Sequence, residues 1–242
     1  MINDLSPIDV AILCGGLGQR LRPAISEAPK VMAQVGKRPF LDFIFEHLEK
    51  QGFRRIILLT GYKAQEIEDY YQKTESRLII EFSREDHPLG TGGALKNAQE
   101  KIKGDPFLVL NGDSFCPLDY NKFLQFHFSK KAWVTLVVSR PMPSEDVGKV
   151  RLSDSGRIME FTEKPKSGSL VSFTRDSWYV NAGIYCFSRE VFDSMPTRWE
   201  FSLEKDWFPQ LVRKEIYGFY TEEKFFDIGT PQRYQEACDA LK

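Results

Sequence analysis

The sequence predicts an α/β fold in which a mostly parallel central sheet carries helices on both faces. Short apolar segments alternate with segments of helical periodicity as far as Ser139, which is typical of strands joined by helices. Two polar segments rich in turn residues come directly after apolar strands, where ligands bind in parallel sheets. A small β-hairpin region is expected around Ser153–Gly156, because two strand-like segments flank these turn residues.

The first half of the chain supplies most of the expected sheet. Between Pro39 and Gly52, the residues Phe40, Ile44 and Leu48 recur every four positions, and the flanking Pro and Gly suit a helix start and stop. The same reading gives strands at Ile8–Cys14, Arg55–Thr60, Leu78–Phe82, Pro106–Leu110 and Trp133–Ser139, and further helices at Lys63–Gln72, Gly92–Lys103 and Leu118–Ser129.

The second half is less regular. Val147–Leu152 and Arg157–Thr162 form the expected hairpin, and Pro231 and Thr230 mark the start of a last helix. The remaining expected elements are a strand at Val180–Phe187, a helix at Leu203–Arg213, a short strand end at Phe225–Phe226 and the final helix at Pro231–Leu241.

Composition narrows the class of protein. A length of 242 residues, with 42% hydrophobic residues and a formal net charge of −1, suits one α/β domain and gives no argument for binding nucleic acid or a membrane surface. The apolar runs are too short to span a bilayer, and acidic residues near the start are unlike a signal peptide. The four scattered cysteines favour buried thiols over zinc ligands and a reducing, cytoplasmic location.

The most informative segment is Gly15–Pro23, which follows the first strand. Glycines there let backbone N–H groups approach phosphate oxygens, and Arg20, Arg22 and Lys30 add positive charge. The dinucleotide fingerprint fails because Leu21 stands at its third glycine position, and no Walker loop is present. An ordinary turn with solvated arginines is the alternative to a phosphate-binding loop.

Two distant aspartates suggest a magnesium site. Asp113 and Asp227 each follow a short apolar strand beside a glycine, and nucleotide-bound Mg²⁺ is usually held by one or two carboxylates. Either could instead be a turn residue.

Three further clusters could bind ligands. Small residues in 88–95 would admit a flat purine, Lys164 could hold an anion, and Asn181 offers a donor and an acceptor to sugar hydroxyls. The segment 88–95 could instead be a flexible entry to a helix. Lys164 could lie at a solvated strand end, and Asn181 could belong to a plain turn.

These motifs, in this order, resemble those of the sugar-1-phosphate nucleotidyltransferases. They are G-G-L-G-Q-R-L-R-P with P-K, then P-L-G-T-G-G-A-L, N-G-D, E-K-P, N-A-G and D-I-G-T-P. The chain looks most like the branch acting on D-glycero-D-manno-heptose 1-phosphate. The resemblance implies a Rossmann-like nucleotide-diphospho-sugar transferase fold in a single domain, with a nucleotide-binding part at about 1–115 and a sugar-binding part at about 116–242.

The resemblance also implies a role for each matching residue. Arg20, Lys30, Asp113 and Asp227 would be catalytic, with the two aspartates holding Mg²⁺. Sugar-phosphate contacts would come from Lys30, Gly148, Glu163, Lys164 and Asn181. The nucleotide would be bound by Leu13, Gly15, Gly16, Gly18, Gln19, Arg20, Gly90 and Thr91. The family usually has Ser or Thr where this chain has Gln19.

The implied reaction is transfer of a nucleotidyl group from a nucleoside triphosphate, by the resemblance GTP, to a sugar 1-phosphate with release of pyrophosphate. Uridylyltransferase and mannose-1-phosphate guanylyltransferase activities remain alternatives, as does a non-catalytic nucleotide-sugar-binding regulator. A glycosyltransferase is disfavoured because Phe115 stands where an Asp-x-Asp motif needs its second aspartate. The resemblance further implies a possible homodimer and a product used for capsule or lipopolysaccharide.

Overall fold

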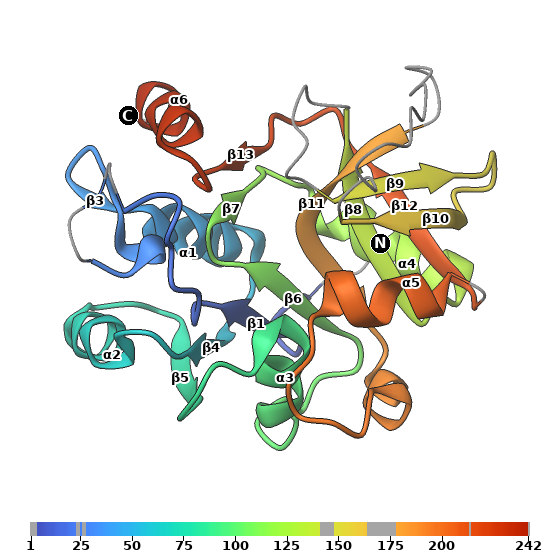
Figure 1. Cartoon of the computed structure of the whole chain (residues 1–242), viewed down its shortest axis with the longest axis horizontal. Helices are drawn as coiled ribbons and strands as arrows, with labels where there is room; N and C mark the ends of the chain where they lie inside the picture. The colour runs from blue at the N-terminus through green and yellow to red at the C-terminus, as the bar shows by residue number, and fades with distance from the viewer. Residues whose placement is uncertain are drawn as a thin grey trace.

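The computed structural model describes residues 4–22, 25, 28–140, 148–163, 178–212 and 214–241. A nine-stranded sheet runs through the middle of the molecule (Figure 1). Its first half has four parallel strands in the order β6 (Phe107–Asn111), β1 (Asp9–Leu13), β4 (Arg55–Thr60) and β5 (Ile79–Arg84).

The second half of the sheet is mixed. The long β11 (Trp178–Phe187) is antiparallel to β6, β8 (Val134–Ser139) and β9 (Lys149–Leu152), and β9 forms a hairpin with β10 (Ile158–Thr162). An unpredicted strand, β12 (Ile216–Tyr220), pairs in parallel with β8. Of the nine described strands, all except β10 and β11 run in the same direction, so the prediction of a mostly parallel sheet with a hairpin is confirmed.

Helices cover both faces of the sheet. Successive strand residues point to opposite sides, so Val10 and Ile12 enter one apolar core and Ala11 enters the other. The first core is packed by α1 (Phe40–Gln51), α2 (Ala64–Lys73), α4 (Tyr120–Lys130) and α6 (Pro231–Ala240). The second core is packed by α3 (Gly90–Asn97) and α5 (Phe208–Leu211).

Two small antiparallel pairs complete the framework. β2 (Gln34–Val35) pairs with β3 (Arg38–Pro39), and β7 (Ser114–Phe115) pairs with β13 (Phe226–Asp227). In Figure 1, β13 lies beside β7 and leads into α6. Short 3₁₀ turns cover Lys30–Met32 and Arg189–Ser194. The β7–β13 pair carries the end of the chain back to the carboxyl end of β6.

Two predicted helices differ in extent. α3 begins at Gly90 and ends at Asn97, after which Lys101 N–H bonds to the Ala98 carbonyl in a tight turn. The expected helix at 203–213 is a π-helical turn (Leu203–Trp207) followed by the short α5. Pro209 lacks an N–H group, so regular helical bonding is interrupted there. The final helix is capped as predicted, because Thr230 Oγ accepts the Arg233 N–H at 3.4 Å.

Within the described residues, none of the helices has the length and apolar character needed to cross a membrane. Cys14, Cys116 and Cys186 are buried thiols, as predicted, and Cys238 is partly exposed.

Candidate active site

Two cavities adjoin each other beyond the carboxyl ends of β1 and β6. Each has a volume of about 260 Å³. Lys30, Thr91, Asn111 and Asp113 line both, so these residues stand where the cavities meet. The first cavity is otherwise lined by Leu13, Cys14, Gly15, Gly16, Leu17, Val31, Glu85, Pro88, Gly90 and Ala94. The second is otherwise lined by Arg20, Ser114, Gly148, Glu163, Asn181, Ser202, Glu204, Lys205, Phe225 and Asp227.

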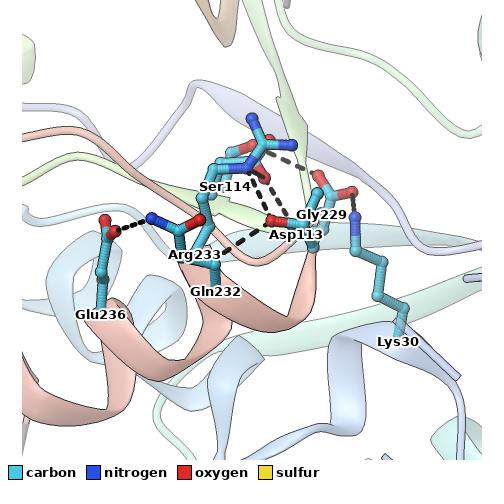
Figure 2. A network of polar contacts seen from close by, with 9 residues as sticks. Lys30, Asp113, Ser114, Gly229, Gln232, Arg233 and Glu236 are labelled. Atoms are coloured by element: carbon cyan, nitrogen blue, oxygen red, sulfur yellow. Dashed lines mark hydrogen bonds and ion pairs between the residues drawn. The ribbon is translucent and has the colours of Figure 1, made fainter. Parts of the chain in front are cut away.

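An ion pair marks the junction. The Lys30 ammonium donates to Oδ2 of Asp113, and the Ser114 hydroxyl donates to Oδ1 of the same carboxylate at 3.2 Å (Figure 2). Lys30 starts the 3₁₀ turn that comes after the glycine-rich loop following β1 (the glycine loop, residues 15–22), and Asp113 follows β6. Burial opposes ionisation of Asp113, but the Lys30 charge and hydrogen bond hold the pKa of that carboxyl below its usual value.

The second predicted aspartate lies beside the first. The β7–β13 pair sets Asp227 opposite Ser114, and the Ile228 N–H donates to the Asp113 carbonyl at 3.0 Å. Gly229 N–H and Arg233 Nε approach Asp227 Oδ1 at 2.5 and 3.4 Å. Burial, and then the negative charge of Asp113, raise the pKa of Asp227. The structure therefore brings together two carboxylates from opposite ends of the chain.

The glycine loop forms one wall of the first cavity. A β-carbon on Gly15 would lie 2.7 Å from Oε1 of Glu85, and one on Gly61 would lie 2.4 Å from the same atom. Gly15 therefore makes room for a carboxylate of this chain. A β-carbon on Gly16 would have nothing within 4 Å, and Gly16 is exposed, so its backbone faces open space.

Three loop residues lie elsewhere. Gly18 has φ +59° and packs against the Lys30 side chain, 3.1 Å from a β-carbon position. Gly18 and the exposed Gln19 line neither cavity, and their nucleotide contacts stay predictions. The Arg22 guanidinium lies over the Tyr62 ring, 5.6 Å from its centre. Of the two loop arginines, Arg20 is the one that lines a cavity, and it does so on the Asp227 side.

The small residues before and within α3 serve two purposes. Gly90 lines the first cavity and has φ +74°, a conformation that favours glycine. A β-carbon on Gly92 would lie 2.1 Å from the Phe201 ring, and one on Gly93 would lie 2.0 Å from the Trp199 carbonyl oxygen. The smallness of Gly92 and Gly93 thus lets this chain pack against itself rather than against a purine.

Three predicted sugar-side residues meet in the second cavity. Asn181 N–H donates to the Gly148 carbonyl at 2.9 Å, and a β-carbon on Gly148 would lie 3.0 Å from Oε2 of Glu163. The antiparallel pairing of β9, β10 and β11 brings these residues together. Gly148 directly precedes β9, Glu163 directly follows β10, and Asn181 lies within β11. Lys164 lies outside the described residues.

Sequence reasoning missed six polar residues that line the cavities, namely Glu85, Asn111, Ser114, Ser202, Glu204 and Lys205. Three of them have contacts that shape the site. Glu85 accepts the Leu89 N–H at 3.2 Å, and burial raises the pKa of its carboxyl. Glu204 is 8% exposed and accepts three hydroxyl hydrogen bonds. Asn111 lines both cavities, and its side chain fits over Gly183. The sequence signal for two of them was indirect: Asn111 belongs to the Asn-Gly-Asp segment, and Glu204 stands at the start of the expected helix at Leu203–Arg213.

Comparison with known proteins decides the family. A model of the nucleotidyl transferase family matches residues 10–242. The chain belongs to the nucleotidyl transferase family. This nucleotidyl transferase is 37% identical over 236 residues to a D-glycero-alpha-D-manno-heptose 1-phosphate guanylyltransferase of Aneurinibacillus thermoaerophilus, covering 97% of this chain and 99% of that protein.

Two further proteins are similar to this nucleotidyl transferase. HddC of Yersinia pseudotuberculosis, in a crystal structure complexed with GMP-PN, has a TM-score of 0.82 at 33% identity, covering 97% of this chain and all of that one. A mannose-1-phosphate guanylyltransferase of Mycobacterium tuberculosis is 34% identical, covering 94% of this chain and 62% of that protein. The HddC structure supports the α/β fold described above.

Proposed function

We propose that this nucleotidyl transferase is a guanylyltransferase that joins GTP to D-glycero-D-manno-heptose 1-phosphate, giving a GDP-sugar and pyrophosphate. The observation that carries the proposal is the junction of two cavities at Lys30 and Asp113. One cavity has a glycine-rich wall suited to a nucleotide, and the other has polar side chains suited to a sugar. The similarity to heptose 1-phosphate guanylyltransferases supports the choice of substrates.

The reaction would be in-line attack by a phosphate oxygen of the sugar 1-phosphate on the α-phosphorus of GTP, with pyrophosphate as the leaving group. Both substrates are anions, so their mutual repulsion is a large part of the barrier. Lys30 stands at the cavity junction and Arg20 lines the second cavity, where their charges would offset this repulsion. Lys164, on the segment after β10, would contribute a third charge.

Asp113 and Asp227 would hold Mg²⁺. Their carboxylates are close enough for the charge of Asp113 to raise the pKa of Asp227, which suits a site that gains a cation. No cluster of three or more His, Cys, Asp or Glu is found among the described residues, and one or two carboxylates are the usual protein ligands for nucleotide-bound Mg²⁺. When bound, the ion would neutralise phosphate charge.

The proposal extends to the surroundings of the enzyme. Buried free thiols favour a cytoplasmic location, and a GDP-heptose would serve the assembly of capsule or lipopolysaccharide. A homodimer is compatible with this proposal. Mannose 1-phosphate is the second candidate acceptor, because a mannose-1-phosphate guanylyltransferase is also 34% identical to this chain.

A substrate screen tests the assignment. Purified protein with Mg²⁺ is incubated with each of GTP, ATP, UTP, CTP and dTTP against both anomers of D-glycero-D-manno-heptose 1-phosphate, mannose 1-phosphate and glucose 1-phosphate. Mass spectrometry then identifies any nucleotide sugar. GDP-heptose as the main product supports the proposal. Main product from UTP and glucose 1-phosphate would replace it with a uridylyltransferase.

A further inference from the structure

A buried carboxylate links the walls of the two cavities. Glu204 stands in the π-helical turn before α5, is 8% exposed and lines the second cavity. Its Oε2 accepts from the Thr91 hydroxyl at 2.6 Å and the Ser202 hydroxyl at 2.8 Å, and its Oε1 accepts from the Tyr185 hydroxyl at 3.2 Å. Acidic side chains are rarely buried to this degree without such partners.

The hydrogen bonds beyond Tyr185 have a fixed direction. An ionised carboxylate can only accept, so the Tyr185 hydroxyl gives its proton to Glu204 and must itself accept from its other neighbour. That neighbour is Asn181, whose Nδ2 donates to the Tyr185 oxygen at 2.9 Å. The opposite end of the amide, Oδ1, accepts the Gly183 N–H at 3.1 Å.

The surroundings of Tyr185 keep its hydroxyl protonated, so that it donates to Glu204 and accepts from Asn181. It has no exposed surface, and burial, together with the charge of Glu204, raises the pKa of its hydroxyl well above the usual value. The phenol therefore keeps its proton and remains a donor to the carboxylate.

We propose that Glu204, acting through Tyr185 and together with the Gly183 N–H, holds the Asn181 amide in one orientation and thereby sets recognition of the sugar 1-phosphate in the second cavity. The inference rests on the proposed function. Asn181 lines the second cavity and keeps one N–H and one oxygen lone pair beyond the two bonds above, so its amide can offer a ligand a donor and an acceptor in a defined order. A reversed amide would present the opposite order to the sugar hydroxyls. Glu204 and Tyr185 are positioning residues.

Two variants separate this role from simple packing. Tyr185→Phe breaks the chain of hydrogen bonds from Glu204 through Tyr185 to Asn181 (the relay) and leaves the Asn181 N–H without its acceptor. In Glu204→Gln the amide oxygen can still accept from Thr91 and Ser202, so its NH₂ faces Tyr185. The phenol must then accept from Gln and turn its own proton toward Asn181, where it opposes the Nδ2 donor. A reversed amide would instead set its NH₂ against the Gly183 N–H, so one hydrogen bond is lost in either orientation. Both variants alter the hydrogen bonds that hold Asn181 in the second cavity and leave the volume of the side chains nearly unchanged.

A matched control exists in the core on the other face of the sheet. Tyr71 is 3% exposed and its hydroxyl donates to the Asp42 carboxylate at 2.7 Å, yet neither residue lines a cavity of the site. Tyr71→Phe therefore removes the same kind of buried hydrogen bond without touching Asn181.

The relay is tested by steady-state kinetics with GTP and the best sugar 1-phosphate. Calorimetry measures the binding of that sugar 1-phosphate separately. Tyr185→Phe and Glu204→Gln should each raise KM and Kd for the sugar 1-phosphate by about tenfold, the size of one lost hydrogen bond. In Tyr185→Phe, kcat and the KM for GTP should stay within about twofold of wild type, as all parameters should in Tyr71→Phe. The double variant should be no weaker than Glu204→Gln alone, because both changes break one chain of bonds.

Unchanged sugar affinity in Tyr185→Phe, or an equal loss in kcat and both KM values, would overturn the relay while leaving the guanylyltransferase proposal intact. Absence of turnover by wild-type protein with every nucleotide and sugar 1-phosphate would instead overturn the proposed function, and the relay with it.

Discussion

The Lys30 ammonium meets the Asp113 carboxylate at the point where the two cavities of the site join. Lys30 comes from a turn after the glycine loop and Asp113 from the end of β6. The pair thus holds a positive and a negative group ready between two anionic substrates. Its consequences for catalysis and stability can be measured separately.

Replacing Lys30 by methionine keeps the length of the side chain and removes its charge. We expect pyrophosphate release to fall by about a hundredfold or more, because one preorganised charged contact contributes on the order of 3 kcal/mol to the transition state. The substitution also leaves Asp113 without its cation, so melting temperature is measured alongside turnover. Near-normal turnover in a folded Lys30→Met protein would remove Lys30 from the catalytic group.

Asp227→Asn should have opposite effects on activity and stability. Burial and the Asp113 charge raise the pKa of Asp227, so its ionised form is disfavoured in the metal-free protein. Asparagine keeps an oxygen for the Gly229 N–H and removes the repulsion, and the melting temperature without Mg²⁺ should rise. Turnover should fall by about a hundredfold, and the Mg²⁺ concentration for half-maximal rate should increase.

The sign of the stability change carries the test at Asp227. If Asp227→Asn melts below wild type in metal-free buffer while keeping its secondary structure, then burial and repulsion from Asp113 do not outweigh the favourable contacts of that carboxylate with Gly229 and Arg233.

Two glycine substitutions distinguish ligand approach from internal packing. Gly16 has open space around its β-carbon position, so Gly16→Ala should leave stability unchanged and weaken GTP binding, because the methyl group would stand where the nucleotide approaches the backbone. At Gly93 the added carbon would lie 2.0 Å from the Trp199 carbonyl oxygen, so Gly93→Ala should lower stability by about 1–3 kcal/mol. Denaturant unfolding and GTP titration measure the two effects. The reverse pattern would place the nucleotide away from Gly16.

His127 predicts a specific dependence of stability on pH. It is 3% exposed and shares a hydrogen bond of 2.8 Å with the Thr135 hydroxyl, and burial lowers its pKa from 6.5 to about 4. Below pH 6.5 the imidazole of His127 binds a proton in the unfolded chain, whereas in the folded chain it stays neutral until the pH approaches 4. The free energy of unfolding therefore falls as the pH drops from 6.5 towards 4. This difference corresponds to about 3 kcal/mol.

The measurement is the free energy of unfolding of wild type and His127→Gln at about pH 7.5 and about pH 4, on either side of this window. Wild type should lose more than the variant, because glutamine does not titrate. Parallel curves for the two proteins would contradict a buried neutral His127.

Local sequence patterns predicted the elements whose signals are local. The strand at Arg55–Thr60 has the predicted bounds, and α1 begins one residue after Pro39 and ends before Gly52. β12 was missed because Gly218 interrupts its short pattern, and that glycine makes room for Leu152, 2.6 Å from its β-carbon position. The place of β11 between β6 and β8 depends on pairing across the whole chain and has no local signature.

The site residues divide in the same way into those marked by local motifs and those defined by distant contacts. The glycine loop, Lys30, Asp113 and Asp227 stand in recognisable segments, and the structure gathers Lys30 and both aspartates around one junction. Glu85 and Glu204 could not be found in this way, because each is defined by partners far away in the sequence. Glu85 fits over Gly15 and Gly61, and Glu204 bonds to Thr91 across more than a hundred residues.

The most direct test of the two-cavity account is a count of pyrophosphate against nucleotide sugar. Wild-type protein with Mg²⁺ and GTP is assayed with and without the sugar 1-phosphate that the screen selects. The account predicts one pyrophosphate released per GDP-sugar formed, and no release without the sugar 1-phosphate. Release of pyrophosphate from GTP alone, or tight binding of both substrates with no release, would contradict it.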